Sequence, residues 1–93
     1  MKTQSIKPAI RLAEKLEHIF VATADSRGTP HVAAAGELRA DSEDRVAVSA
    51  WFCPGTLANL QHNKHIALVV WDSANDHGFQ LVGVVEQIEE LSV

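Results

Sequence analysis

The stretch WFCPGTLANL, residues 51–60, decides the fold. It follows a strand-like apolar run over residues 46–52 and precedes another over residues 66–71. The Pro-Gly pair predicts a tight corner that opens a short helix, with Thr56 as the N-cap whose hydroxyl accepts a hydrogen bond from the first turn. Such a helix presents free N–H groups and the positive end of its dipole beside the sheet, which suits an anion such as phosphate. The alternative is a plain capped helix that connects two strands.

The composition is that of one small globular domain spanning residues 1–93. Hydrophobic residues make up 46% and charged residues 22% of the chain, which argues against disorder. The formal net charge is -4 and Lys and Arg form no run, so we expect no nucleic-acid partner. The longest apolar runs are strand-sized and residues 1–8 are polar, which predicts neither a membrane span nor a signal peptide. With a single cysteine and no internal disulfide, we expect a cytoplasmic protein.

The first third of the chain predicts a helix followed by a β-hairpin. Apolar residues recur at helical spacing over residues 6–16, and Ser5 is the predicted N-cap. Residues 19–24 read as a strand because β-branched and aromatic residues are frequent in them. The loop over residues 25–29 places Gly28 at the position that needs a positive φ, which predicts a hairpin.

The returning strand, residues 30–38, contains an unusual run of small residues, AAAG at 33–36. Alanine and glycine are poor strand formers, so another factor must favour them here. Four small side chains in succession let other atoms approach the backbone closely. Those atoms could belong to a neighbouring segment, to a partner chain or to a flat ligand.

The second half of the chain predicts three further strands and the short helix after the corner. The strands are residues 46–52, 66–71 and 79–88. Leu57 and Leu60 are expected to face the core from the helix. Gly83 in the last strand suggests a bulge, a bend at a barrel corner or a close backbone approach.

Together these elements predict a mainly β fold, a small antiparallel barrel with an N-terminal helix and one short helix between strands. A chain of this size buries only a modest fraction of its surface. Small all-β chains often complete their core by dimerising, and we expect a homodimer here.

Few residues form a recognisable catalytic or metal-binding pattern. The five histidines are scattered, and none has the spacing of a helical zinc site, so we expect no metal. Ser49 and Cys53 have no base marked beside them by spacing. Thr56 and Asn59 lie one turn apart on one helix face, close to the small-residue strand. This combination suits a flat cofactor that carries a phosphate.

The order of these features resembles the pyridoxamine-phosphate-oxidase-like, FMN-binding split-barrel family. The resemblance runs from about His18 to Ile88. It rests on the hairpin FVATADSRGTPHVAAAGEL, the segment GTLANLQHNKHIALVVWD, the Asp-bounded turn that follows and the last strand GFQLVGVVEQI. The segment GTLANL is similar to the family's Lys-Thr-x-x-Asn-Leu helix, with Gly55 in place of the lysine.

The resemblance implies a split β-barrel that dimerises and holds FMN at the dimer interface, with oxidoreductase-like chemistry supplied by the flavin. Thr56 and the helix N–H groups from Gly55 onward would hold the phosphate, and Asn59 would support that loop. The remaining implied cofactor-binding residues are Ala34, Ala35 and Gly36 beside the ring or ribityl chain, and the backbone of Ala50, Trp51 and Phe52 at the isoalloxazine edge.

Departures from the family pattern keep other functions open. Because Gly55 replaces the basic residue, the phosphate would depend on helix N–H groups, Thr56 and cations from elsewhere. The chain ends at Val93 without the substrate-binding segment of true pyridoxamine-phosphate oxidases, so we do not expect that activity. The alternatives are a barrel that binds haem or a deazaflavin, with a histidine or Cys53 as the axial ligand to haem iron, or a ligand-free interaction domain.

Overall fold

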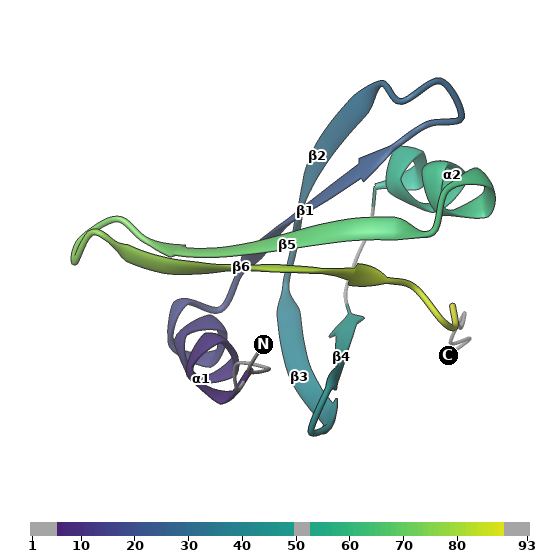
Figure 1. Ribbon diagram of the computed structural model, residues 1–93. Coiled ribbons are helices and arrows are strands. Elements are labelled where there is room, and N and C mark those ends of the chain that lie inside the picture. The colour runs from purple at the N-terminus through teal and green to yellow at the C-terminus, as the bar shows by residue number, and fades with distance from the viewer. Residues whose placement is uncertain (1–5, 50–52, 89–93) are drawn as a thin grey trace, which may run out of the picture.

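The computed structural model describes residues 6–49 and 53–88, which form two helices and six strands (Figure 1). The elements are α1 (Lys7–Leu16), β1 (Ile19–Ala24), β2 (Pro30–Ala35), β3 (Glu37–Ser42), β4 (Arg45–Ser49), α2 (Pro54–His62), β5 (His65–Asp72) and β6 (His77–Val84). Four strands form one antiparallel sheet in the order β2-β1-β5-β6, and β3 pairs with β4 in a second, two-stranded sheet. The predicted fold class, a small mainly β barrel with two helices, is confirmed.

One predicted strand is in fact two. The run over residues 30–38 divides at Gly36, so that β2 pairs with β1 in the large sheet and β3 pairs with β4 in the small one. Gly36 itself lies outside both strands. The bend lets one continuous segment contribute a strand to each of two sheets that share a core. The barrel is therefore divided into two sheets at this bend.

The hairpin between β1 and β2 forms as predicted. Gly28 has φ 86°, and Asp25 fixes the loop because its side chain accepts hydrogen bonds from the backbone N–H groups of Arg27 and Thr29. This loop sets the register that places Thr23 opposite His31. Both side chains belong to the candidate site described below.

Helix α1 packs its apolar side against β3 and β5. The N-cap of α1 is Ile6, which makes no side-chain cap bond, so the prediction of Ser5 as N-cap is wrong. Pro8 is tolerated near the start of the helix because the N–H groups of the first turn have no intrahelical acceptors. Glu17 closes the helix in the left-handed conformation. The core cluster comprises Ile10, Ala13, Ile19, Val21, Ala35, Leu38, Leu68 and Val70.

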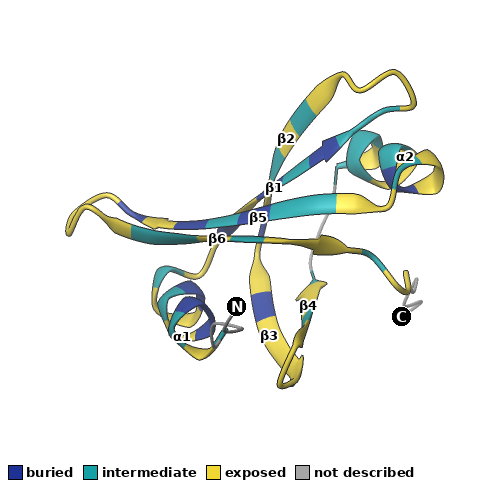
Figure 2. Ribbon diagram, viewed as in Figure 1, coloured by how far each residue is buried: buried dark blue, intermediate teal, exposed yellow. Residues whose placement is uncertain are grey.

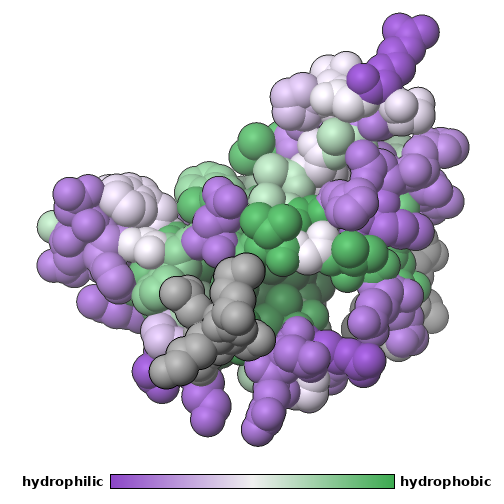
Figure 3. Space-filling model, viewed as in Figure 1, coloured by the Kyte–Doolittle hydropathy of each residue, from purple (hydrophilic) through white to green (hydrophobic). Residues whose placement is uncertain are grey.

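Successive side chains of each strand point to opposite sides of the large sheet, and the described helices and strands leave one of these sides without a covering layer. Residues on this side pair with one another across all four strands, as in the row Val32, Ala22, Ala67 and Val82. We call it the open face, and its apolar residues are Phe20, Ala22, Val32, Ala34, Ala67, Val69, Trp71, Val82 and Val84. Val82 is 72% exposed and Val32 64% exposed. Exposed segments mark β2 and β6 in Figure 2, and Figure 3 shows apolar side chains at the surface in the middle of the viewed face.

Two other predictions about apolar positions and glycine need correction. Leu57 is 44% exposed, so it does not face the core, whereas Leu60 is buried as predicted. Gly83 lies in an unbroken register with Ile66, and a Cβ there would meet nothing within 4 Å. The predicted bulge or close approach at Gly83 is therefore wrong. The close approach in β6 occurs at Gly78, where a Cβ would collide with the backbone of Val70 and the ring of Trp71.

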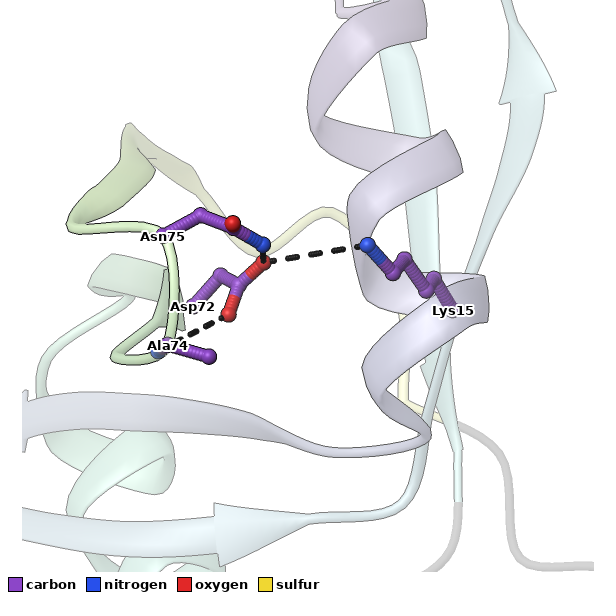
Figure 4. Close-up of polar contacts among 4 residues, drawn as sticks. All are labelled: Lys15, Asp72, Ala74 and Asn75. Carbon is purple, nitrogen blue, oxygen red and sulfur yellow. Dashed lines mark hydrogen bonds and ion pairs between the residues drawn. The ribbon is translucent and has the colours of Figure 1, made fainter.

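A buried carboxylate ties α1 to the turn between β5 and β6 (Figure 4). Asp72 is 6% exposed and accepts hydrogen bonds from the side chain of Asn75 and the N–H of Ala74, at 2.7 and 3.1 Å. Lys15 Nζ lies 3.9 Å from Asp72 Oδ2. The Asn75 side-chain bond is the main reason why the pKa of Asp72 lies below its usual value, and Lys15 adds to the shift.

This network predicts an acid-sensitive contribution to stability. A carboxyl group whose pKa is lower in the folded state stabilises the fold at pH values above its unfolded pKa of about 3.9, and the contribution is lost as the pH falls through the folded pKa. Asp72→Asn should therefore lower the free energy of unfolding at pH 7, and the difference from the wild type should shrink on acidification. Urea unfolding of the wild type and the variant at pH 7 and at an acidic pH tests this, with the exposed Asp41→Asn as control. A difference that is independent of pH would contradict the assignment.

Candidate functional site at the start of α2

Helix α2 begins three residues earlier than the sequence suggests. Cys53 is the N-cap, with an extended backbone, and Pro54 occupies the first helical position. Proline is favoured there because its φ already suits a helix and its missing N–H would have no intrahelical acceptor. The N–H groups of Thr56 and Leu57 both donate to the carbonyl oxygen of Cys53, at 3.1 and 3.4 Å. Thr56 as N-cap is therefore wrong; it occupies the third helical position, and no side-chain cap bond is made.

The Thr56 hydroxyl has no protein partner in the described part of the chain. Its oxygen exposes almost no surface and makes no hydrogen bond there. Leaving a buried polar group unsatisfied costs about 1–3 kcal/mol. Such a cost calls for an explanation, and a bound group that completes the hydrogen bonding is one.

Asn59 connects α2 to the sheet. Its side-chain nitrogen donates to the hydroxyl of Thr23 at 3.1 Å, and Thr23 is 5% exposed on the core-facing side of β1. Thr56 and Asn59 are three residues apart and therefore share one face of the helix. The face that carries the unsatisfied hydroxyl is thus held against the β1–β2 hairpin.

His31 completes this end of the site, and sequence reasoning did not single it out. Its Nε2 lies 3.3 Å from Cys53 Sγ, in a partly buried contact between residues 22 positions apart. Its ring lies so close to Gly55 that a Cβ there would be 3.1 Å from His31 Cε1. Side chains of β2 alternate between the two sides of the sheet, and His31 is paired with Thr23. His31 therefore lies on the same side of the sheet as Thr23, the side that α2 covers. The hairpin register was the only signal in the sequence that could have indicated this.

The small-residue run does not gather at the same place. Ala34 is exposed on the open face, beside Phe20, whereas Ala35 is buried in the core cluster. Gly36 is exposed and lines a shallow depression of about 500 Å³ that also holds Glu14 and Glu17. The remaining residues of the predicted flavin edge, Ala50, Trp51 and Phe52, lie outside the described residues. The roles given to these six residues stay predictions.

The structure therefore brings together Gly55, Thr56 and Asn59 with Thr23, His31 and Cys53 at the junction of α2 and the β1–β2 hairpin. Within residues 6–49 and 53–88, no group of three or more His, Cys, Asp or Glu side chains is arranged to hold a metal. Neither helix of that part of the chain is long and apolar enough to cross a membrane. The junction therefore contains hydroxyl, imidazole and thiol groups within one small region.

The comparison with known families decides the assignment. The family model described as pyridoxamine 5'-phosphate oxidase matches residues 6–92. The chain belongs to this family. No curated protein matches the chain.

Solved structures with the same fold come from two bacteria. HupZ of Group A Streptococcus is 23% identical with a TM-score of 0.76, and the match covers 98% of this chain and 70% of that one. A histidine-to-alanine variant of HupZ is 25% identical with a TM-score of 0.73, covering 98% of this chain and 75% of the variant. HutZ, the haem storage protein from Vibrio cholerae, is 16% identical with a TM-score of 0.67, covering 96% of this chain and 67% of HutZ. These matches support the split-barrel fold.

The position of Thr56 leads to a prediction about stability without ligand. Thr56→Val replaces the unsatisfied hydroxyl by a methyl group of similar shape, so the free energy of unfolding should stay unchanged or rise by about 1 kcal/mol. Thr56→Ser keeps the hydroxyl and serves as the control. Urea unfolding without added ligand measures both. If Thr56→Val instead lost about 1 kcal/mol, the hydroxyl would be acting as a cap after all.

Proposed function

We propose that this chain is an FMN-binding, oxidoreductase-like homodimer. The observation that carries the proposal is the buried Thr56 hydroxyl, which lacks a partner in the first turn of α2. A phosphate oxygen would satisfy that hydroxyl, and the positive end of the helix dipole favours an anion at this end. Membership of the pyridoxamine 5'-phosphate oxidase family supports a phosphorylated ligand.

The residues of the junction would bind and orient the cofactor. Thr56 would donate its hydroxyl hydrogen to the phosphate, and the N–H of Gly55 would face the same anion. Asn59 would keep α2 seated on the hairpin through its bond to Thr23. Bound FMN would supply the electron transfer, and the protein would supply position and electrostatics.

The open face supports the homodimer. Apolar residues cover the open face from β2 to β6, including Trp71 and Val84, which are 44% and 59% exposed. A contiguous apolar surface of this kind is typical of a protein interface. A second copy packed on the open face would cover these apolar side chains, and the family resemblance implies such a homodimer.

The first test is a titration with FMN and with riboflavin, which lacks the phosphate. Wild-type protein should bind FMN, seen as a flavin absorbance shift and quenching of tryptophan fluorescence, and should bind riboflavin more weakly. Thr56→Val should weaken FMN binding by about tenfold or more, because a hydrogen bond to a charged group is lost. Thr56→Ser should retain most of the affinity. Folded protein that binds no FMN at saturating concentration would refute the proposal.

A charge on the open face should disrupt the dimer. Val82→Glu would bury an unpaired carboxylate in the interface, so the protein should become monomeric at concentrations where the wild type is dimeric. Sedimentation equilibrium measures the change. Ala47→Glu on the exposed side of β4 is the matched control and should stay dimeric. If wild type and Val82→Glu sediment identically, the open face is not the interface.

Haem is the second candidate ligand, and one feature of the open face favours it. His65 is exposed and pairs with Val84, so an imidazole stands at the edge of an apolar surface that could receive a porphyrin. Similarity to HutZ, the haem storage protein, motivates the test although it shows the fold alone. Haem binding through His65 predicts a Soret band that His65→Ala removes and the exposed His77→Ala does not. A spectrum unaffected by His65→Ala would exclude His65 as the axial ligand.

A further inference from the structure

The junction of α2 and β2 contains the imidazole of His31, in contact with both Gly55 and Cys53. His31 is only partly buried, and its ring lies against the backbone of the first turn of α2. A Cβ at position 55 would be 3.1 Å from Cε1, a tight contact that the ring could relieve only by shifting slightly. Glycine at position 55 therefore lets the ring of His31 lie close to the helix backbone.

The two ring nitrogens of His31 are in different surroundings. Nε2 is 3.3 Å from Cys53 Sγ, which fixes the orientation of the ring. Both nitrogens lie near Gly55, because its Cβ position would be 3.4 Å from Nε2 and 3.7 Å from Nδ1. Among the described residues Nδ1 has no hydrogen-bond partner. It is thus a donor or acceptor beside Gly55 that the described protein groups leave unused.

A phosphate at this place would need a positive charge. Three of the described cations are held in ion pairs, Lys15 with Asp72, Arg39 with Glu37 and Arg45 with Glu86. An imidazolium carries such a charge and is a hydrogen-bond donor at both ring nitrogens. Protonated at both nitrogens, His31 would direct Nδ1–H at the phosphate while Nε2–H faces Cys53.

We propose that His31 is the cationic residue of the phosphate site, and that Cys53 positions its ring. The inference rests on the proposed function, because it names a residue that would hold the FMN phosphate. The geometry that carries it is the ring of His31 against Gly55, together with Nδ1 of His31 and the hydroxyl of Thr56, neither of which has a hydrogen-bond partner among the described residues.

Dissociation constants for FMN and riboflavin, measured side by side, test this inference. His31→Gln keeps a polar side chain of similar reach but cannot become a cation, so it should weaken FMN binding about tenfold or more and leave riboflavin binding unchanged. His62→Gln, at the exposed far end of α2, is the matched control and should affect neither ligand. Cys53→Ala should weaken FMN binding by a smaller factor, because it only releases the ring.

The failure of this inference can be told apart from the failure of the FMN proposal. If the wild type binds no FMN, both fail. If the wild type binds FMN and His31→Gln binds it equally well, His31 does not contact the phosphate and the inference alone is overturned. Equal losses for FMN and riboflavin in His31→Gln would also overturn it, since they would indicate a role toward the ring or the fold. Circular dichroism and urea unfolding confirm that each variant is folded.

Discussion

The described helices and strands cover only one side of the four-stranded sheet. Helix α1 and the β3–β4 hairpin cover that side and build the core on it, while the other side keeps its apolar row of Val32, Ala22, Ala67 and Val82 at the surface. Burial of apolar area is the main driving force of folding, so this uncovered face favours association. The bend at Gly36 lets one continuous segment provide a strand to each of the two sheets, β2 to the large one and β3 to the small one.

The start of α2 is built around a proline and a glycine with different purposes. Pro54 sets the first helical position, which places Thr56 inside the first turn rather than at the cap. Gly55 leaves room for the ring of His31. As a result the hydroxyl of Thr56 and the free nitrogen of His31 stand close to the same helix end. The unsatisfied hydroxyl is a cost that a bound phosphate would remove, which is the physical basis of the proposed function.

Much of the fold could be predicted from local patterns, whereas the site depended on tertiary register. The amphipathic spacing of α1, the Gly28 hairpin and the apolar run of β5 are local signals and were predicted correctly. The division at Gly36 was missed because the pairing of β3 with β4 is a tertiary contact, which the continuous sequence of residues 30–38 does not reveal. The contact of His31 with Cys53 was missed for the same reason. Thr56 was misplaced because threonine favours caps, but the fixed φ of Pro54 decided where the helix begins.

The most direct test of the central claim is a crystal structure of the protein grown with saturating FMN. We expect the phosphate at the first turn of α2, with one oxygen within hydrogen-bond distance of Thr56 Oγ1 and another within reach of His31 Nδ1. We also expect a second copy of the chain packed on the open face. A flavin phosphate bound elsewhere, or an α2 junction that stays empty at saturating FMN, would contradict this account.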